Sequence, residues 1–116
     1  MNFNHVHLLG NLTSDPESRV VSGRDGSNTT VSNFTVAVNR HYKLKNGEAR
    51  KDVAYVPCEV WDSAAEFMSK YCEKGDLLLV QGSLKMDQWQ DKESGYNRAM
   101  LYEIVRNLKR LNFAPA

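Results

Sequence analysis

The segment 52–75, DVAYVPCEVWDSAAEFMSKYCEKG, places the strongest constraint on the fold, because both a strand and a helix can be recognised in it. Its first half alternates with a period of two, which is the period of a β-strand. One set of positions is small and apolar, namely Val56, Cys58 and Val60. The other set carries two large aromatic side chains beside a carboxylate and a proline, namely Tyr55, Pro57, Glu59 and Trp61. The first face suits a core, and the second suits a surface on which planar ligands stack.

The second half of this segment predicts a helix with a defined start and end. Ser63 and Glu66 have the spacing of a capping box, and Gly75 is suited to a left-handed C-terminal cap. Apolar side chains follow at helical spacing, at positions Ala64, Phe67, Met68 and Tyr71. We therefore expect a helix with a structural role that packs this stripe on the core.

Length and charge limit the classes of protein that fit. At 116 residues, the chain is long enough for one domain with its own core. We expect this domain to span 1–111, followed by a short end at 112–116. The net charge is only +1, so an argument for a polyanionic ligand depends on local charge. The sequence shows no apolar run of transmembrane length and no secretory leader, so we expect a cytoplasmic protein without a membrane partner.

The cysteines and histidines give no indication of a metal site or an enzyme. Cys58 and Cys72 form no CxxC pair and fall on apolar faces, so we predict buried free thiols. His5 and His7 share one strand face, but a metal site needs a further ligand, so we interpret them as surface or interface residues. We expect no metal, no cofactor and no catalysis, since paired carboxylates, a Ser/His/Asp order and a phosphate-binding glycine loop are missing from the sequence.

Four further strands are predicted on either side of the segment, at 3–12, 31–42, 76–86 and 96–106. Gly10 and Gly82 interrupt the first and the fourth strand, where a bulge or bend is expected. Residues 15–17 predict a turn, and 20–31 read as a mobile hairpin tip, which either reaches a ligand or is a tolerated loop.

The most charged passage is 40–51, in which five cations accompany one acid, for a local net charge of +4. Its cations are Arg40, Lys43, Lys45, Arg50 and Lys51, and its Asn46-Gly47 pair predicts a hairpin turn. A charge run is commonly a solvated turn. Its position directly before the strand with Tyr55 and Trp61 favours a nucleic-acid groove.

Trp89 lies in the polar stretch 87–95 and has almost no apolar company. A tryptophan in such surroundings buries poorly, which leaves two interpretations. The side chain packs against the rim of the fold or a neighbouring subunit, or it stacks on the base of a bound nucleic acid. The other exposed aromatic side chains favour stacking.

The predicted order is three strands, one helix and two strands. This is the order of an all-β, five-stranded Greek-key barrel of the oligonucleotide-binding (OB) type, with its helix between strands three and four. The binding face of such a barrel and its two long hairpins would hold four aromatic side chains together: Tyr42, Tyr55, Trp61 and Trp89.

Four passages, GNLTSDPESR, NFTVAVNR, YCEKGDLLLVQGSLKMDQW and YEIV, resemble the bacterial single-stranded DNA-binding proteins, and the resemblance covers 2–108. It implies a homotetramer that binds single-stranded DNA without catalysis in replication, recombination and repair, and that associates with the nucleoid. It also implies that bases stack at Tyr42, Tyr55, Trp61 and Trp89. The stacking role of Tyr42 comes from this resemblance, because the parity of its strand alone groups it with the core residues Phe34 and Val38.

Phosphate contacts are expected from the five cations of 40–51, and further from Lys85, Arg19, Lys92 and Arg98. The chain departs from the family in carrying Tyr in place of Trp at two stacking positions, and in having Asp87 and Gln88 before Trp89, where basic residues are common. The acidic C-terminal tip of the family has no counterpart before Ala116. Either the sequence is a shortened form, or it is a variant that binds DNA without recruiting replication and repair proteins through a tail.

Two other interpretations fit the same pattern of strands and aromatic residues. A primosome-type or RNA-binding barrel shares the fold, and a dimer without preference for single strands would indicate it. A structural barrel would instead bury its aromatic side chains at subunit contacts, and protection of Trp89 from quenchers without DNA would indicate that.

Overall fold

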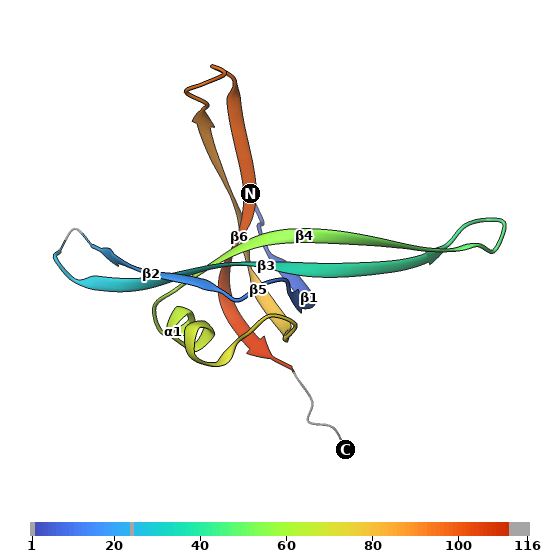
Figure 1. The fold of residues 1–116 in the computed structure, drawn as a ribbon, viewed down its shortest axis with the longest axis horizontal. Helices are drawn as coiled ribbons and strands as arrows, with labels where there is room; N and C mark the ends of the chain where they lie inside the picture. The colour runs from blue at the N-terminus through green and yellow to red at the C-terminus, as the bar shows by residue number, and fades with distance from the viewer. Residues whose placement is uncertain (1, 24, 112–116) are drawn as a thin grey trace.

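Six strands and one helix make up the computed structural model in the part of the chain that it describes, residues 2–23 and 25–111. The expected short end at 112–116 lies outside the described residues. Figure 1 shows the β2–β3 and β3–β4 hairpins projecting in opposite directions and the β5–β6 hairpin projecting across them. The elements are β1 (Val6–Leu12), β2 (Glu17–Ser22), β3 (Asn28–Lys43), β4 (Ala49–Trp61), α1 (Asp62–Tyr71), β5 (Leu77–Gln90) and β6 (Asn97–Arg110).

The strands close into a barrel through a second pairing of β1. The sheet order is β1-β5-β6-β4-β3-β2, and β1 also pairs with β3 through Asn11↔Ala37 and Leu12↔Val36. This pairing joins β1, β5, β6, β4 and β3 into a five-stranded ring, with a short parallel contact between β4 and β6. The all-β, OB-type fold with its helix between the third and fourth barrel strands is therefore confirmed.

The strand β2 is an addition to the prediction, which had a turn at 15–17 and a hairpin tip from residue 20 onwards. It pairs with β3 from Glu17↔Asn33 to Ser22↔Asn28, so it continues the path of β1 along the same neighbour. The predicted tip is thus shorter than expected, because backbone pairing extends the strands on both sides of it.

Two glycines allow the barrel strands to approach one another closely. A Cβ atom built on Gly10 would overlap the carbonyl oxygen of Ala37, and one built on Gly82 would overlap that of Ile104. The ladder between β5 and β6 also shifts register between Gln81 and Gly82, as a β-bulge does. The bends predicted at both positions thus coincide with sites where only a residue without Cβ fits.

The core is built from the strand faces that the alternation predicts. Its buried side chains come from all five barrel strands and from the segment after β4, and include Leu12, Phe34, Val36, Cys58, Val60, Ala65, Met68, Cys72, Leu78, Val80 and Val105. Both cysteines are buried and free, as predicted. In the described ranges, no helix has the length and apolarity that a membrane crossing requires.

The predicted helix exists, but its start differs. Trp61 is the N-cap residue and no side chain caps the helix, so the capping box predicted at Ser63 and Glu66 is wrong. Because β4 runs directly into α1, the helix begins at Asp62, and Ser63 already belongs to its first turn. Asp62 has a φ of 61°, and its carboxylate accepts a hydrogen bond from the Thr29 hydroxyl of β3.

The predicted end and apolar stripe of the helix are also corrected. Cys72 ends the helix in an extended conformation, while Gly75, at φ 94°, lies in the following turn and donates its N–H to the Leu12 carbonyl. Ala65 and Met68 are the buried helix positions. Phe67 and Tyr71 of the predicted stripe are exposed and pack on each other, with ring centroids 5.2 Å apart.

Candidate nucleic-acid interface

The outer face of β4 presents two aromatic side chains to solvent. Tyr55 is 66% exposed and Trp61 is 40% exposed, with the half-buried Pro57 and Glu59 between them. The indole Nε1 of Trp61 donates a hydrogen bond of 2.6 Å to Oε1 of Glu59. This bond fixes the edge of the indole ring and leaves its face available for stacking.

The β5–β6 hairpin supplies a second wall. Its register pairs Trp89 with Arg98 and Asp87 with Met100, and residues directly opposite one another share a face of the sheet. Asp87, Met100 and Tyr102 line a pocket of about 110 Å³ together with Asn33, Pro57, Cys58 and Glu59, so this face of the hairpin looks onto the outer face of β4. Trp89, 47% exposed, belongs to the same hairpin face.

A second pocket of about 220 Å³ extends this hollow towards the segment between β1 and β2. It shares Asn33, Pro57, Cys58 and Met100 with the first pocket and adds Ser14, Asp15, Glu17, Phe34 and Thr35. We call the two pockets together the groove. The faces that carry Tyr55, Trp61 and Trp89 adjoin it, so these three predicted stacking residues are brought to one surface.

Tyr42 does not share that surface. In the β3–β4 register it pairs with Arg50, on the same ribbon face as the core pair Val36↔Val56, whereas Tyr55 pairs with Ala37 on the other face. The register therefore does not bring Tyr42 to the face that carries Tyr55, and its role in stacking stays a prediction. Its ring instead lies beneath the Arg40 guanidinium, 4.8 Å from the ring centroid to Cζ.

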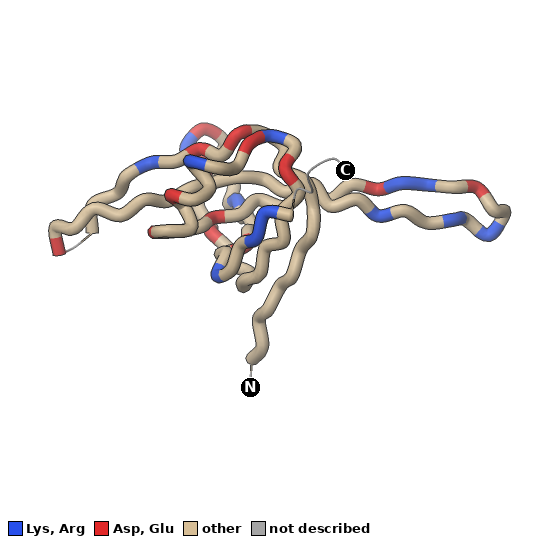
Figure 2. The backbone as a smooth tube through the Cα atoms, turned by 90° about the horizontal axis from the view of Figure 1, so that it is seen from below, with Lys and Arg blue, Asp and Glu red and all other residues tan. Residues whose placement is uncertain are grey.

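The hairpin from residue 40 to 52, which we call the basic arm, carries the predicted cations along two strands (Figure 2). Arg40 forms an ion pair of 2.9 Å with Asp52, and Arg50 one of 3.1 Å with Glu48. The arm's three lysines, Lys43, Lys45 and Lys51, are exposed and take no part in the ion pairs found among the described residues.

The remaining predicted cations lie on β2, on β5 and at the end of the β5–β6 hairpin. Lys85 is exposed on the groove-facing side of β5 and pairs in register with Tyr102. The Arg19 guanidinium donates a hydrogen bond of 3.2 Å to Oδ1 of Asn33. In the sheet, Arg19 of β2 pairs with Val31 of β3, which in turn pairs with Trp61 of β4. Lys92 and Arg98 lie at the end of the β5–β6 hairpin, where Arg98 is bound to Asp91 at 2.8 Å.

The groove itself is acidic, a property that the sequence prediction did not include. Its lining contains Asp15, Glu17, Glu59 and Asp87 and no lysine or arginine. The phosphates of a nucleic acid would therefore be repelled from this lining and attracted to the cations of the basic arm. A polynucleotide held here would place uncharged bases over the floor and its backbone towards the cations.

Below the groove lies a carboxylate that the sequence prediction missed. Glu103 is fully buried, and neither of its carboxylate oxygens has a hydrogen-bond partner among the described residues. Burial raises the pKa of Glu103 to about 7. Its register neighbour Cys58 is also buried, and burial followed by the Glu103 charge raises the pKa of the thiol to about 12. The available signal was parity, because Glu103 alternates in phase with the core residue Val105.

The described residues contain no group of three or more His, Cys, Asp or Glu side chains that could hold a metal ion. The rings of His5 and His7 stack on each other at a centroid distance of 4.4 Å.

An OB-type barrel, exposed aromatic side chains on strand faces that also line an acidic groove, and an arm with three exposed lysines are features of proteins that bind extended polynucleotides. Residues 3–111 match the Single-strand binding protein family. The chain belongs to this family.

Relatives of known name span nearly the whole chain. It is 37% identical over 111 residues to the Single-stranded DNA-binding protein 1 of Synechocystis sp., a match covering 96% of this chain and 85% of that protein. It is 38% identical over 106 residues to the Single-stranded DNA-binding protein B of Bacillus subtilis, covering 90% and 88%. A solved Plasmodium falciparum SSB complex with ssDNA superposes with a TM-score of 0.80 over 97% of each chain, at 21% identity, which supports the fold.

Proposed function

We propose that this protein binds single-stranded DNA independently of base sequence, as a non-enzymatic homotetramer that protects DNA during replication, recombination and repair in the cytoplasm. The observation that carries the proposal is the exposure of Tyr55, Trp61 and Trp89 on strand faces that also line the groove. Membership of the Single-strand binding protein family and relatives of that name support it.

Stacking accounts for the preference for single strands. Every base has a π-face, so an exposed aromatic ring accepts any of them, at about 1 to 3 kcal/mol per base. A duplex hides these faces inside its own stack. The hydrogen bond from Trp61 to Glu59 restricts the orientation of the indole ring before DNA binds, so that less side-chain conformational freedom is lost on binding.

The cations supply a salt-sensitive contribution. Lys43, Lys45 and Lys51 of the basic arm neutralise phosphates and release their counterions. Arg40 and Arg50 contribute less in this proposal, because each must first give up an acidic partner. Tyr42 lies on the back of the arm, so it stacks only on a strand that crosses from one ribbon face to the other.

Tryptophan fluorescence tests the stacking model directly, because the sequence contains two tryptophans and both are proposed contacts. Titration with oligo-dT at low salt should quench the emission, and Trp61→Ala or Trp89→Ala should weaken binding by about 1 to 3 kcal/mol. Tyr71→Ala, on the exposed side of α1, is the matched control and should bind like the wild type. Unchanged emission at saturating DNA contradicts the model.

The assembly is tested separately. Light scattering of the protein alone and with dT oligomers of increasing length measures the number of subunits and the length of DNA that one assembly covers. A dimer that binds duplex DNA or RNA as well as single strands contradicts the proposed tetramer and its specificity.

A further inference from the structure

Tyr96 is an exposed aromatic residue outside the four predicted stacking positions. It is 76% exposed and lies at the turn of the β5–β6 hairpin. The N–H of Asp91 donates to the Tyr96 carbonyl at 2.8 Å, so backbone pairing continues one step beyond Gln90↔Asn97. By the alternation of the strand, Tyr96 falls on the same face as Arg98, the partner of Trp89.

This face is the one that looks onto the groove. Further along it come Met100 and Tyr102, which line the pocket beside β4. Tyr96 and Trp89 are diagonal neighbours across the two strands. Side chains in that relation lie about 7 to 8 Å apart, which is close enough for large aromatic side chains to contact the same ligand. This face therefore carries apolar and aromatic side chains from Met100, beside the groove, to Trp89 and Tyr96 at the end of the hairpin.

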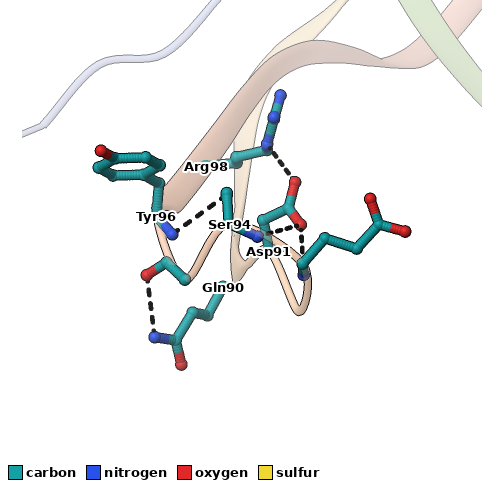
Figure 3. Close-up of polar contacts among 7 residues, drawn as sticks. Gln90, Asp91, Ser94, Tyr96 and Arg98 are labelled. Atoms are coloured by element: carbon teal, nitrogen blue, oxygen red, sulfur yellow. Dashed lines mark hydrogen bonds and ion pairs between the residues drawn. The ribbon is translucent and has the colours of Figure 1, made fainter.

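The turn that carries Tyr96 is held by a dense set of hydrogen bonds (Figure 3). The Asp91 carboxylate accepts from the backbone N–H groups of Glu93 and Ser94, at 2.9 and 3.3 Å, and forms the ion pair with Arg98. The two backbone donors, first that of Glu93 and then that of Ser94, lower the pKa of Asp91.

Further bonds fix the backbone on either side of the ring. Gly95, at φ 74°, donates its N–H to the Asp91 carbonyl at 2.8 Å and accepts from Gln90 Nε2 at 3.1 Å. The Ser94 hydroxyl accepts from the N–H of Tyr96 at 3.3 Å. The dashed contact of Tyr96 in Figure 3 leaves from its backbone N–H, while its ring points away from the turn. Because these hydrogen bonds fix the backbone of the turn, the Tyr96 ring can bind a ligand with little further loss of conformational freedom.

We propose that Tyr96 is a stacking site for a base of single-stranded DNA, at the outer end of the surface that begins in the groove. The inference rests on the proposed function and extends it to the end of the β5–β6 hairpin. The hairpin from 85 to 98 contains three cations and three acids, so its net charge is zero. Stacking, rather than attraction of phosphates, accounts for its contribution.

Because the side chain of Tyr96 is uncharged and neutralises no phosphate, a substitution there should change the affinity for DNA without changing its dependence on salt. Tyr96→Ala should weaken binding to long dT oligomers on the order of tenfold and leave the slope of log affinity against log salt unchanged. Tyr96→Phe should bind like the wild type, because the ring and not the hydroxyl makes the contact. The double variant Lys43→Ala, Lys45→Ala should instead lower the slope, by about 0.7 for each phosphate that is no longer neutralised.

The matched control is Tyr71→Ala, since Tyr71 is also an exposed tyrosine, 59% exposed, but lies on the helix. Melting followed by circular dichroism should be the same for both alanine variants and the wild type. The weaker binding of Tyr96→Ala should appear only with oligomers long enough to pass Trp89 and reach the turn.

Two outcomes separate this inference from the function on which it rests. If the wild type neither binds dT nor changes its tryptophan emission, the proposed function fails. If the wild type binds with quenching and Tyr96→Ala binds equally tightly, only the role of Tyr96 is overturned. A Tyr96→Ala variant with wild-type affinity but an altered mass by light scattering would assign the residue to a subunit contact and would equally overturn the proposal.

Discussion

Replacing Glu103 with glutamine removes a titratable group from the interior of the barrel while keeping its size and shape. The wild-type carboxyl is fully buried, has no hydrogen-bond partner in the described part of the chain, and has its pKa raised by burial from 4.5 to about 7. The folded protein therefore holds this proton at pH values where the unfolded chain releases it. The stability that this group contributes is highest below pH 4.5 and falls as the pH rises towards 7.

The size of the effect follows from the difference between the two pKa values. Each unit corresponds to about 1.4 kcal/mol, so the interval from 4.5 to about 7 corresponds to roughly 3 kcal/mol of unfolding free energy. Most of this decrease lies between about pH 5 and pH 8. For a domain of this size it corresponds to a decrease in melting temperature of roughly 10 °C.

Thermal and urea unfolding of wild type and Glu103→Gln, measured at intervals from about pH 5 to pH 8, tests this. Other titrating groups are common to both proteins, so they cancel in the difference between the two profiles. As the pH rises over this range, the free energy of unfolding of Glu103→Gln should increase relative to that of the wild type by about 2 to 3 kcal/mol. Glu66→Gln, which changes an exposed carboxylate of α1, is the control. Parallel profiles for wild type and Glu103→Gln would refute the reasoning.

Two further substitutions and one chemical probe test the barrel. Gly82→Ala should lower the free energy of unfolding by about 3 kcal/mol, since its Cβ would overlap the backbone of Ile104. Gly47→Ala, at φ 85° in open space, should cost only about 1 to 2 kcal/mol, and equal urea midpoints for the two variants would contradict the packing argument. Cys58, with a pKa of about 12, should resist alkylation at about pH 8 until the protein unfolds, and labelling of the native protein at the rate of a free thiol would show that it is accessible.

Much of the fold could be predicted because one-sided burial imposes a readable alternation. Cys58 and Val60 point inwards and Tyr55 and Trp61 outwards, as the parity of the strand indicates. The Asn46-Gly47 turn was readable for a similar reason, since its signal is local. These features depend on residues that are close together in the sequence, so they can be predicted from it directly.

The features that were missed depend on contacts between distant segments. The helix begins at Asp62 because β4 enters it directly and Thr29 of another strand binds the Asp62 carboxylate. Gly75 does not cap the helix, because its N–H binds the carbonyl of Leu12. Likewise, β2 forms by pairing with β3, and this pairing is not visible in the residues of β2 themselves. No local pattern encodes these partners.

The site shows the same division. The alternation placed Tyr42 on the strand face opposite to that of Tyr55, as the register does, but Tyr42 is exposed rather than part of the core. The resemblance alone moved it to the groove. Counting charges over 40–51 gave an excess of cations, but the hairpin register pairs Arg40 with Asp52, one residue beyond that passage. The acidic groove likewise collects carboxylates from β4, β5 and the segment after β1, which lie far apart in the sequence.

The projecting hairpins also determine how the molecule moves through water. Its radius of gyration is 17.1 Å, with extents of 59 × 47 × 36 Å, against about 13 Å for a compact domain of this length. Such a particle experiences more friction than a sphere of equal mass and leaves a sizing column early. A sizing column calibrated with compact standards would therefore overestimate the mass of the single subunit, whereas sedimentation equilibrium, which is independent of friction, would return its true mass.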